Sequence, residues 1–415
     1  MAMSKMFKLG DELKNVLIDL RNILTLRYDP NKLLVSPIKN IAYEEIKNRK
    51  EPHPSTFDIE RGLRRAIRYN IINLNPQRIS IALSAGVDSN LILSLIRDEF
   101  PELDINCVTV SFDEHTEAKT AQKLAENKSS TFRNVFVDDP LRELPFLISI
   151  VKEPRWNVYQ FYFILESSRF SNVLFTGDGG DELFGGYTFR YRRFLESLTE
   201  NSNWHDKARL YLECHERDWV PDQEKMFNPS MNFDWESIYS LFRGYFENDL
   251  DPLDQIFMAD YYGKLVHDFI PSNEKFFKHF KMKGIAPMLD ASIVEKAFKI
   301  PPSLKYDSSK NIGKIPLRKI IARHDSSLIL DTKVGFGMDL KSLWQRGAKG
   351  IVVSNLENGR IFEDKIINKE FYNRSLKRID ETLDVRYISK MLQLLSLEIW
   401  YKMFITMEMS PKNLL

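Results

Sequence analysis

The stretch "ISIALSAGVDSNLILSLI", from Ile79 to Ile96, constrains the fold of this chain more than any other segment. Its first part, Ile79 to Leu83, is short, mostly apolar and bounded by turn-forming residues, as is typical of a buried strand. From Asp88 onward apolar residues recur at helical spacing, and Asp88 or Ser89 can cap the first turn. The pattern therefore predicts a strand, a tight loop and a helix.

The predicted loop consists of the small residues Ser84, Ala85 and Gly86. Backbone N–H groups at a helix N-terminus carry partial positive charge and favour an anion such as phosphate. The chain contains neither Gly-x-x-x-x-Gly-Lys-Ser/Thr nor Gly-x-Gly-x-x-Gly, the two common nucleotide fingerprints. We therefore expect a phosphate loop of another kind, with an ordinary strand-to-helix turn as the alternative.

Strand and helix patterns alternate on both sides of this loop. We expect further strands over 105–112, 132–137 and 172–177, and helices over 57–69, 117–128 and 156–168. Such alternation predicts a doubly wound, mainly parallel α/β sheet. After Ser197 aromatic-rich helical patterns dominate without a convincing strand series, which predicts a mostly helical C-terminal region.

These patterns also suggest how the chain is organised. Leucines and valines from Leu13 to Leu24 share one face of a helix expected over 11–26, and a polar, proline-containing link follows it through Pro54. We expect an N-terminal helical extension over 1–56, an α/β domain over 57–197 and a helical part over 198–415.

Composition limits the partners and the compartment. The formal net charge is +1, from 59 basic and 58 acidic residues, so a nucleic-acid partner is not favoured. The segment "YTFRYRRF" alternates aromatic and basic residues, which suits nucleic acid but also suits simple packing on a helix. Two cysteines and the lack of an apolar run of roughly 18 residues favour a cytoplasmic protein without a membrane span.

A second motif, "NVLFTGDGGDELFGGYTFRYRRF", begins with the strand expected over 172–177. Its glycines permit sharp turns, and Asp178, Asp181 and Glu182 bring carboxylates to the carboxyl end of that strand, where open α/β sheets bind ligands. Carboxylates beside a phosphate loop suit Mg²⁺, which takes its other ligands from phosphate and water. The alternative is a solvated acidic turn.

Together these motifs resemble the synthetase domain of the asparagine synthetases, which belong to the ATP pyrophosphatases with a Ser-Gly-Gly-x-Asp-Ser loop (the adenine nucleotide alpha hydrolase-like fold). "SAGVDS" is similar to that loop, with Ala85 in place of one glycine, and the Gly-rich motif is similar to Gly-Asp/Glu-Gly-x-Asp-Glu-x-Phe-Gly-Gly-Tyr. Three later segments also match the family, in order: "PMLDASIVEKAFKIPPSLKY", "GKIPLRKII" and "DTKVGFGMDLKSLW".

The resemblance implies an enzyme that adenylates a carboxylate with ATP and then transfers ammonia or an amine to it. It implies that Ser84, Ala85, Gly86, Val87, Asp88, Ser89, Val110 and Gly177 bind ATP or pyrophosphate, and that Asp88 and Asp181 hold Mg²⁺. Lys314 matches the family lysine that would stabilise phosphate oxygens, although a solvated loop lysine is the alternative. Asp178 matches the position that faces the acyl adenylate and would orient the amine or accept its proton.

Two departures from the family bear on the substrate. Position 2 is Ala2, where family members carry the cysteine of a glutaminase domain, so glutamine hydrolysis within this chain is not supported and a separate ammonia donor is possible. The family's Leu-Glu-x-Arg-Val-Pro becomes "MKGIAP", which places Lys283 at the acidic position and Ile285 at the arginine. We therefore expect a carboxylate other than aspartate.

Several functions remain open at this stage. The amine can be intramolecular, as in the related β-lactam synthetases and the macrolactam synthetases of lasso peptides, where the carboxylate belongs to a small molecule or a peptide. An RNA-modifying enzyme with the same loop and a catalytically silent partner subunit are the alternatives from other classes.

Overall fold

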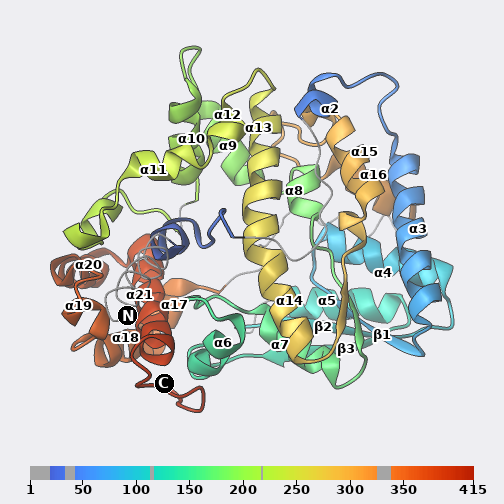
Figure 1. Cartoon of the computed structure of the whole chain (residues 1–415). Coiled ribbons are helices and arrows are strands. Elements are labelled where there is room, and N and C mark those ends of the chain that lie inside the picture. The colour runs from blue at the N-terminus through green and yellow to red at the C-terminus, as the bar shows by residue number, and fades with distance from the viewer. Residues whose placement is uncertain (1–18, 33–42, 113–115, 216–217, 325–337) are drawn as a thin grey trace, which may run out of the picture.

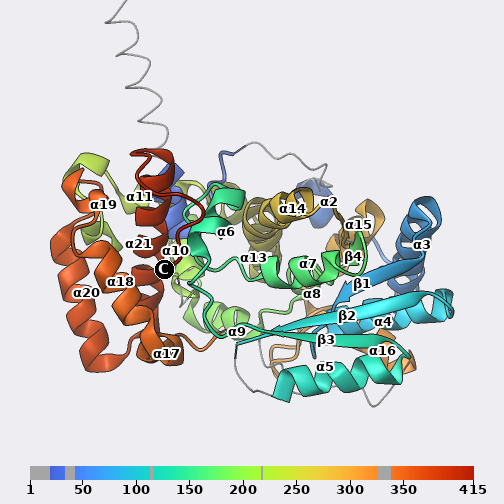
Figure 2. The ribbon, with the colours of Figure 1, turned by 90° about the horizontal axis from the view of Figure 1, so that it is seen from below.

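Five parallel strands form one sheet in the computed structural model, which describes residues 19–32, 43–112, 116–215, 218–324 and 338–415. The strand order across the sheet is β3-β2-β1-β4-β5 (Figures 1 and 2). The strands are β1 (Arg78–Ala82), β2 (Asp104–Ser111), β3 (Thr131–Phe136), β4 (Val173–Phe175) and β5 (Lys283–Ile285).

The order of the strands reverses between β1 and β4. From β1 the chain adds β2 and β3 on one side, and then returns to add β4 and β5 on the other. This is the doubly wound, parallel α/β arrangement that the sequence predicts. In such sheets ligands bind outside the carboxyl ends of the strands at the point of reversal, which here lies between β1 and β4.

Strand β5 lies in the region after residue 197 that the sequence predicts to be mostly helical, and the sequence pattern does not identify it. Its three residues, Lys283 to Ile285, pair in parallel with Val173 to Phe175 of β4. A segment of three residues with a central glycine is too short to display the alternation that identifies a strand. Its extended conformation follows from pairing with β4, which lies more than 100 residues earlier in the sequence.

Helices cover both faces of the sheet, because successive side chains of a strand point to opposite faces. Ile81 of β1 and Phe175 of β4 belong to one apolar cluster, which includes side chains of α4 (Val87–Glu99) and α5 (Thr116–Asn127). Leu174 belongs to a second cluster, together with side chains of α7 (Gln160–Ser168) on the other face (Figure 2). The sheet is therefore the middle layer of three.

The other helices surround this core. Before β4 lie α2 (Tyr43–Lys47), α3 (Thr56–Leu74) and α6 (Leu144–Val151), and after it α8 (Gly180–Phe184), α9 (Thr188–Ser197), α10 (Trp204–Glu213), α11 (Trp235–Ser240), α12 (Arg243–Phe246), α13 (Pro252–Met258), α14 (Ile270–His279), α15 (Ala291–Lys299) and α16 (Ile315–His324). A π-helix, Ala259–Phe269, joins α13 to α14. None of the described helices has the length and apolar character needed to cross a membrane.

The C-terminal region is helical, as predicted. It consists of α17 (Leu340–Leu343), a π-helical turn (Trp344–Ala348), α18 (Lys349–Leu356), α19 (Arg360–Glu363), α20 (Lys369–Thr382) and α21 (Val385–Phe404). Helix α21 packs on α6, α18 and α20 and lies at the opposite end of the molecule from α3 (Figure 1). The predicted boundaries of the three domains stay predictions.

The described part of the N-terminal extension packs against this region. Residues 19–26 are helical, and Leu20 and Leu24 are buried, whereas Leu13 lies outside the described residues. The Lys390 ammonium of α21 donates to the Leu24 carbonyl oxygen (2.7 Å) at the C-terminal end of that helix, where a cation is favourable. Burial lowers the pKa of Lys390 to about 7, against the attraction of Asp218.

We predict that Lys390→Met changes how stability depends on pH. Because the pKa of Lys390 is depressed in the folded state, protonation of this side chain costs stability, and the cost is absent above pH 10.5 and grows as the pH falls to about 7. The free energy of unfolding of the variant minus that of the wild type should therefore fall as the pH rises from 7 to 10.5. Urea unfolding at several pH values measures this difference.

Lys377→Met serves as the control, because the Lys377 side chain is 80% exposed on the neighbouring helix α20. It removes one positive charge without removing a buried amine. An equal pH trend in both variants would contradict the role assigned to the burial of Lys390.

Candidate active site

Hydrogen bonds within the loop after β1 hold its shape. The N–H groups of Ser84 and Gly86 donate to Ser89 Oγ (3.0 Å) and Ser84 Oγ (3.1 Å), and the two hydroxyl oxygens lie 3.1 Å apart. Asn90 Nδ2 donates to the Gly86 carbonyl oxygen (2.7 Å). The two serines and the glycine that the sequence singles out are thus one connected unit, and Ala85 completes the loop between them.

Helix α4 begins directly after this loop, at Val87, and Gly86 is its N-cap residue. The expectation that Asp88 or Ser89 caps the helix is therefore wrong. Ser89 instead uses its hydroxyl to close the loop, and Asp88 lies in the first turn, where its carboxylate is available to the neighbouring motif.

The Gly-rich motif runs from the end of β4 into α8 and packs directly against α4. A Cβ atom added at Gly180 would lie 2.4 Å from Asp88 Cγ, and one added at Gly177 would lie 2.9 Å from Asp88 Cβ. Contacts below about 3.0 Å do not occur for real Cβ atoms. Glycine at these two positions therefore allows the two motifs to meet.

Lys314 joins the two motifs by its ammonium group. Its Nζ atom lies 2.7 Å from Asp181 Oδ1 and also forms a hydrogen-bonded ion pair with Asp88 Oδ2. The Lys314 side chain is only 6% exposed. Burial alone would lower its pKa, but the carboxylates of Asp181 and Asp88 raise it above the usual range, so the ammonium stays charged. The alternative of a solvated loop lysine is excluded by this position.

The backbone of Lys314 is also fixed to α8. Its N–H donates to the Phe184 carbonyl oxygen (2.9 Å), and its φ angle is +57°, in the left-handed region that residues with a Cβ enter at a cost of about 1–2 kcal/mol. Helix α16 begins at the next residue, Ile315. The matched segment "GKIPLRKII" therefore turns sharply to present its lysine.

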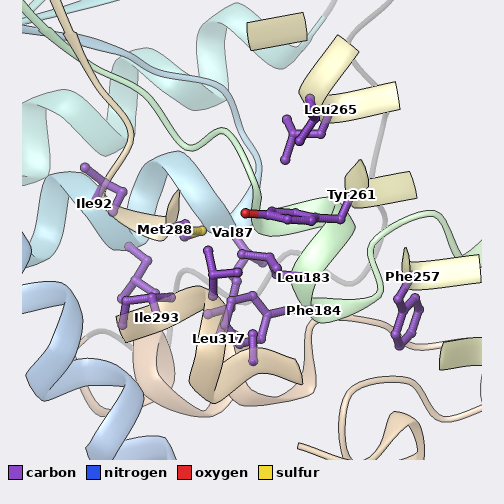
Figure 3. Packing of buried hydrophobic residues seen from close by; sticks show 14 of the residues in the cluster. Val87, Ile92, Leu183, Phe184, Phe257, Tyr261, Leu265, Met288, Ile293 and Leu317 are labelled. Carbon is purple, nitrogen blue, oxygen red and sulfur yellow. The ribbon is translucent and has the colours of Figure 1, made fainter. Parts of the chain in front are cut away.

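Apolar packing beneath these groups fixes the relative positions of α4, α8 and α16 (Figure 3). Val87, Leu183 and Leu317, one from each helix, lie together in the first cluster, and each is at most 8% exposed. Burial of one such side chain stabilises the fold by about 1.5–3 kcal/mol. Met288, from the matched segment "PMLD", is buried in the same cluster.

Asp178 faces a different neighbour from Asp181. Its Oδ2 atom accepts hydrogen bonds from Thr176 Oγ1 (2.9 Å) and Asn273 Nδ2 (3.0 Å), the latter on α14. Burial raises the pKa of the Asp178 carboxyl, the two hydrogen bonds lower it, and the negative charges of Asp88 and Asp181 raise it further, so that the net shift is upward. Asn273 lies in no motif, so sequence reasoning missed it.

Glu182 does not point to the ligand edge with the other two carboxylates. It is buried, and its Oε1 atom accepts a hydrogen bond from the Tyr187 hydroxyl. Arg190 lies over the Tyr187 ring, 3.9 Å from its centroid, and forms a bidentate pair with Asp260 of the π-helix (2.9 and 3.3 Å). The segment "YTFRYRRF" thus uses Tyr187 and Arg190 for buried packing, which is the simpler of the two interpretations.

The remaining predicted site residues lie apart from this cluster. Val110 is near the carboxyl end of β2, with its side chain buried in the second apolar cluster. Lys283 is exposed at the amino end of β5, whereas Ile285 is buried at the carboxyl end, where its carbonyl oxygen accepts from the Thr176 N–H (2.9 Å). The structure therefore brings Ile285, but not Lys283, to the ligand edge.

The last matched segment lies partly beyond what the structure describes. The residues "DTKVGFG", 331–337, are outside the described residues, and Met338 to Trp344 continue into α17 and the π-helical turn after it.

The donor set suits Mg²⁺ brought with a nucleotide. Among the described residues, no group of three or more His, Cys, Asp or Glu side chains is arranged to hold a metal ion by itself. Asp88 and Asp181 nevertheless converge on a single point, since both contact the same ammonium group. In nucleotide sites, Mg²⁺ is usually bound by one or two carboxylates, and phosphate oxygens and water supply its remaining ligands.

A parallel, doubly wound sheet with a Ser-rich loop after β1 and clustered carboxylates after β4 defines the class of ATP-pyrophosphatase-like α/β proteins. The family model described as asparagine synthase matches residues 59–402, and no glutaminase model matches the chain. The chain belongs to the asparagine synthase family and is an ATP-using enzyme of the ligase type.

Other comparisons add little. The search of curated proteins found no match. Among solved structures, the NMN synthetase from Francisella tularensis is similar at 15% sequence identity and a TM-score of 0.27, covering 50% of this chain and 92% of that one. That similarity is too low to carry an argument about function.

We predict that Gly186→Ala disrupts the site. A Cβ atom at this position would lie 1.8 Å from Asp181 Oδ1 and 2.4 Å from Lys314 Cε, so the ion pair would have to separate. ATP binding, measured by calorimetry in the presence of Mg²⁺, should weaken at least about tenfold, which corresponds to the loss of about 1.4 kcal/mol.

Gly244→Ala is the matched control, because nothing lies within 4 Å of the added Cβ atom. Wild-type affinity for ATP in the Gly186 variant would show that the pairing of Asp181 with Lys314 is not needed for nucleotide binding.

Proposed function

We propose that this chain is an AMP-forming amide ligase that adenylates a carboxylate and transfers ammonia or an amine to the activated acyl group. One observation carries the proposal: Lys314 contacts both Asp88 of the phosphate loop and Asp181 of the Gly-rich motif, at the carboxyl ends of β1 and β4. A charge-stabilising group between two potential metal ligands suits chemistry at a phosphate.

In the first half-reaction, a carboxylate oxygen attacks the α-phosphorus of ATP. The bond from that phosphorus to the bridging oxygen breaks, and pyrophosphate leaves with the electron pair. The hydroxyls of Ser84 and Ser89, whose oxygens lie 3.1 Å apart, would turn from each other to donate to the departing pyrophosphate. Lys314 stabilises the charge that develops on the phosphate oxygens.

Asp88 and Asp181 would hold Mg²⁺ in this reaction. When bound, the ion neutralises negative charge on the β- and γ-phosphates. The two carboxylates also keep Lys314 protonated, because their charge outweighs the effect of its burial. The same pair of side chains therefore serves both cations of the site.

In the second half-reaction, ammonia or an amine attacks the acyl carbonyl carbon, and AMP leaves. The nitrogen must lose a proton as the amide forms. Asp178 is the candidate acceptor, because burial and the neighbouring carboxylates raise the proton affinity of its carboxyl group. Asn273 and Thr176 orient the carboxylate through their hydrogen bonds to Oδ2.

The wall that would meet the acyl substrate differs from that of asparagine synthetases. At the carboxyl end of β5, where the family places an arginine, this chain has Ile285, whose apolar side chain is buried in the first apolar cluster. An apolar residue there offers no bidentate partner for a second carboxylate on the substrate. We therefore propose a small-molecule or peptide carboxylate other than aspartate, with ammonia from a separate glutaminase, free ammonia or an amine of the same molecule as nitrogen source.

We predict that Asp88→Asn and Asp181→Asn each nearly abolish adenylation. Lys314→Ala should lower the rate of adenylation by about 10²–10³, as expected for the loss of one preorganised charge-stabilising group. ATP–pyrophosphate exchange, run with a panel of carboxylic acids, measures the adenylation step. Lys310→Ala, an exposed lysine in the same segment, should leave exchange unchanged.

Near-normal exchange in both aspartate variants, with folding verified by circular dichroism, would rule out the proposed metal site. Exchange that is absent with every acid in wild type would favour a catalytically silent subunit.

A separate prediction concerns the products and the choice of acyl and nitrogen substrates. Turnover should release AMP and pyrophosphate, aspartate should be a poor substrate, and glutamine should not serve as a nitrogen donor for the chain alone. Measuring AMP release with aspartate plus ammonia and with aspartate plus glutamine tests both halves. Efficient asparagine formation with ammonia would refute only the acyl half, whereas stoichiometric ADP would refute the adenylation chemistry.

A further inference from the structure

Helix α3, which packs on α4, α15 and α16, carries a row of exposed arginines. The side chains of Arg61, Arg65 and Arg68 are 80%, 65% and 59% exposed. Their spacing of four and three residues places them on one face of the helix. Figure 1 shows α3 at the edge of the molecule.

Each of these arginines has an acidic partner that is less exposed than the arginine itself: Arg61 pairs with Asp58 (2.6 Å), Arg65 lies 3.9 Å from Asp290, and Arg68 pairs with Glu99. Glu99 pairs with Arg68 and Arg64 but is only 8% exposed, and Glu60 is 13% exposed. Burial opposes ionisation of Glu99, but hydrogen bonds from Arg68 and Arg64 lower its pKa, so it stays charged beneath them. The more exposed acids of this face, Asp58, Asp98 and Asp290, are exposed by 35–37%. The arginine is therefore the more exposed member of each of these three pairs.

Large apolar side chains flank the arginines at both ends of α3. Phe57, Tyr69 and Ile72 are 69%, 68% and 66% exposed. A surface hollow of about 720 Å³ lies between α3 and α16, and its lining includes Phe57, Tyr69, Arg64, Arg68, Arg323 and His324. Apolar groups gathered on one exposed face mark an interaction site more often than a chance arrangement.

We infer that this surface, the α3–α16 face, docks a partner protein through a segment that carries carboxylates beside an apolar anchor. Arginine and aromatic residues are the types that contribute most to protein interfaces, and here both line one hollow. The exposed arginines select an acidic partner, and the hollow accepts its apolar side chain. A nucleic acid fits less well, because it gains nothing from Ile72 and because the chain carries a net charge of only +1.

The α3–α16 face is separate from the candidate active site. Lys314 precedes the first residue of α16, whereas Arg323 and His324 are in its last turn. Likewise, Asp88 is in the first turn of α4, and Glu99 is its last residue. A bound partner would therefore leave the ligand edge of the sheet open, and substitutions on α3 should not alter ATP binding.

The triple variant Arg61→Gln, Arg65→Gln, Arg68→Gln tests the inference. Its matched control is Arg192→Gln, Arg209→Gln, Arg243→Gln, three arginines on other helices that are 60%, 50% and 58% exposed. The full-length wild-type chain is used to select binders from a phage-displayed library of random 12-residue peptides. Affinities of the selected peptides are then measured by fluorescence anisotropy at low and high salt.

We expect selected peptides that combine Asp or Glu with aromatic or aliphatic residues. Their affinity should fall at least about tenfold in the α3 variant and at high salt, and should be unchanged in the control variant. Tyr69→Ser with Ile72→Ser should weaken the same peptides without changing the salt dependence. Unchanged thermal unfolding midpoints and ATP affinity show that the variants are folded.

Three outcomes would overturn the inference. They are failure to select any peptide, selected peptides whose binding is equal in wild type and the α3 variant, and random-sequence RNA that binds more tightly than the peptides and depends on the same arginines. The last of these would assign the face to nucleic acid instead.

Discussion

The site depends on one buried ammonium group held between two carboxylates. Lys314 connects the loop after β1, the Gly-rich motif after β4 and the start of α16, three segments that are far apart in sequence. A buried charge without a partner costs several kcal/mol, so neither the lysine nor the aspartates could keep this position alone. The glycines around them exist in this context because a side chain would occupy the space of the ion pair.

Helix α13, the π-helix and α14 follow one another directly and form one long rod. Polar side chains of this rod contact the residues around the Lys314 ion pair. Asn273 on this rod binds Asp178, and Asp260 binds Arg190, which lies over the ring of Tyr187. Tyr187 in turn binds Glu182, next to Asp181. Buried charges of this kind add little net stability, but they tolerate few alternative arrangements, because every displaced partner leaves an unpaired group. π-Helical segments occur often at functional sites, and this one contacts the Gly-rich motif through the pair of Asp260 with Arg190.

Residue patterns in the sequence predict much of the fold and part of the candidate active site. The strand, loop and helix around Ser84 follow from small residues between two apolar patterns, and the sheet follows from the alternation of such patterns. The sequence predicts that Asp88 and Asp181 lie close together, because the carboxyl ends of parallel strands meet at one edge of the sheet. The place of Lys314 beside them follows from the resemblance to the asparagine synthetases. Residue patterns could not reveal Asn273, because one asparagine on an amphipathic helix carries no signal until tertiary packing places it beside Asp178. The same holds for β5, whose conformation is set by its neighbour, and for Glu182, whose motif position does not show that it turns inward.

The placement of β5 has a consequence for how this enzyme can change. In the proposed function, the loops that handle phosphate follow β1 and β4, each of which has a partner strand on both sides, whereas Ile285, the residue expected near the acyl group, lies on an edge strand of three residues. An edge strand has a partner on only one side, so substitutions and small shifts there disturb fewer contacts. Evolution can therefore redirect such an enzyme to a new acid by altering the margin of the sheet, while the machinery that spends ATP is inherited intact.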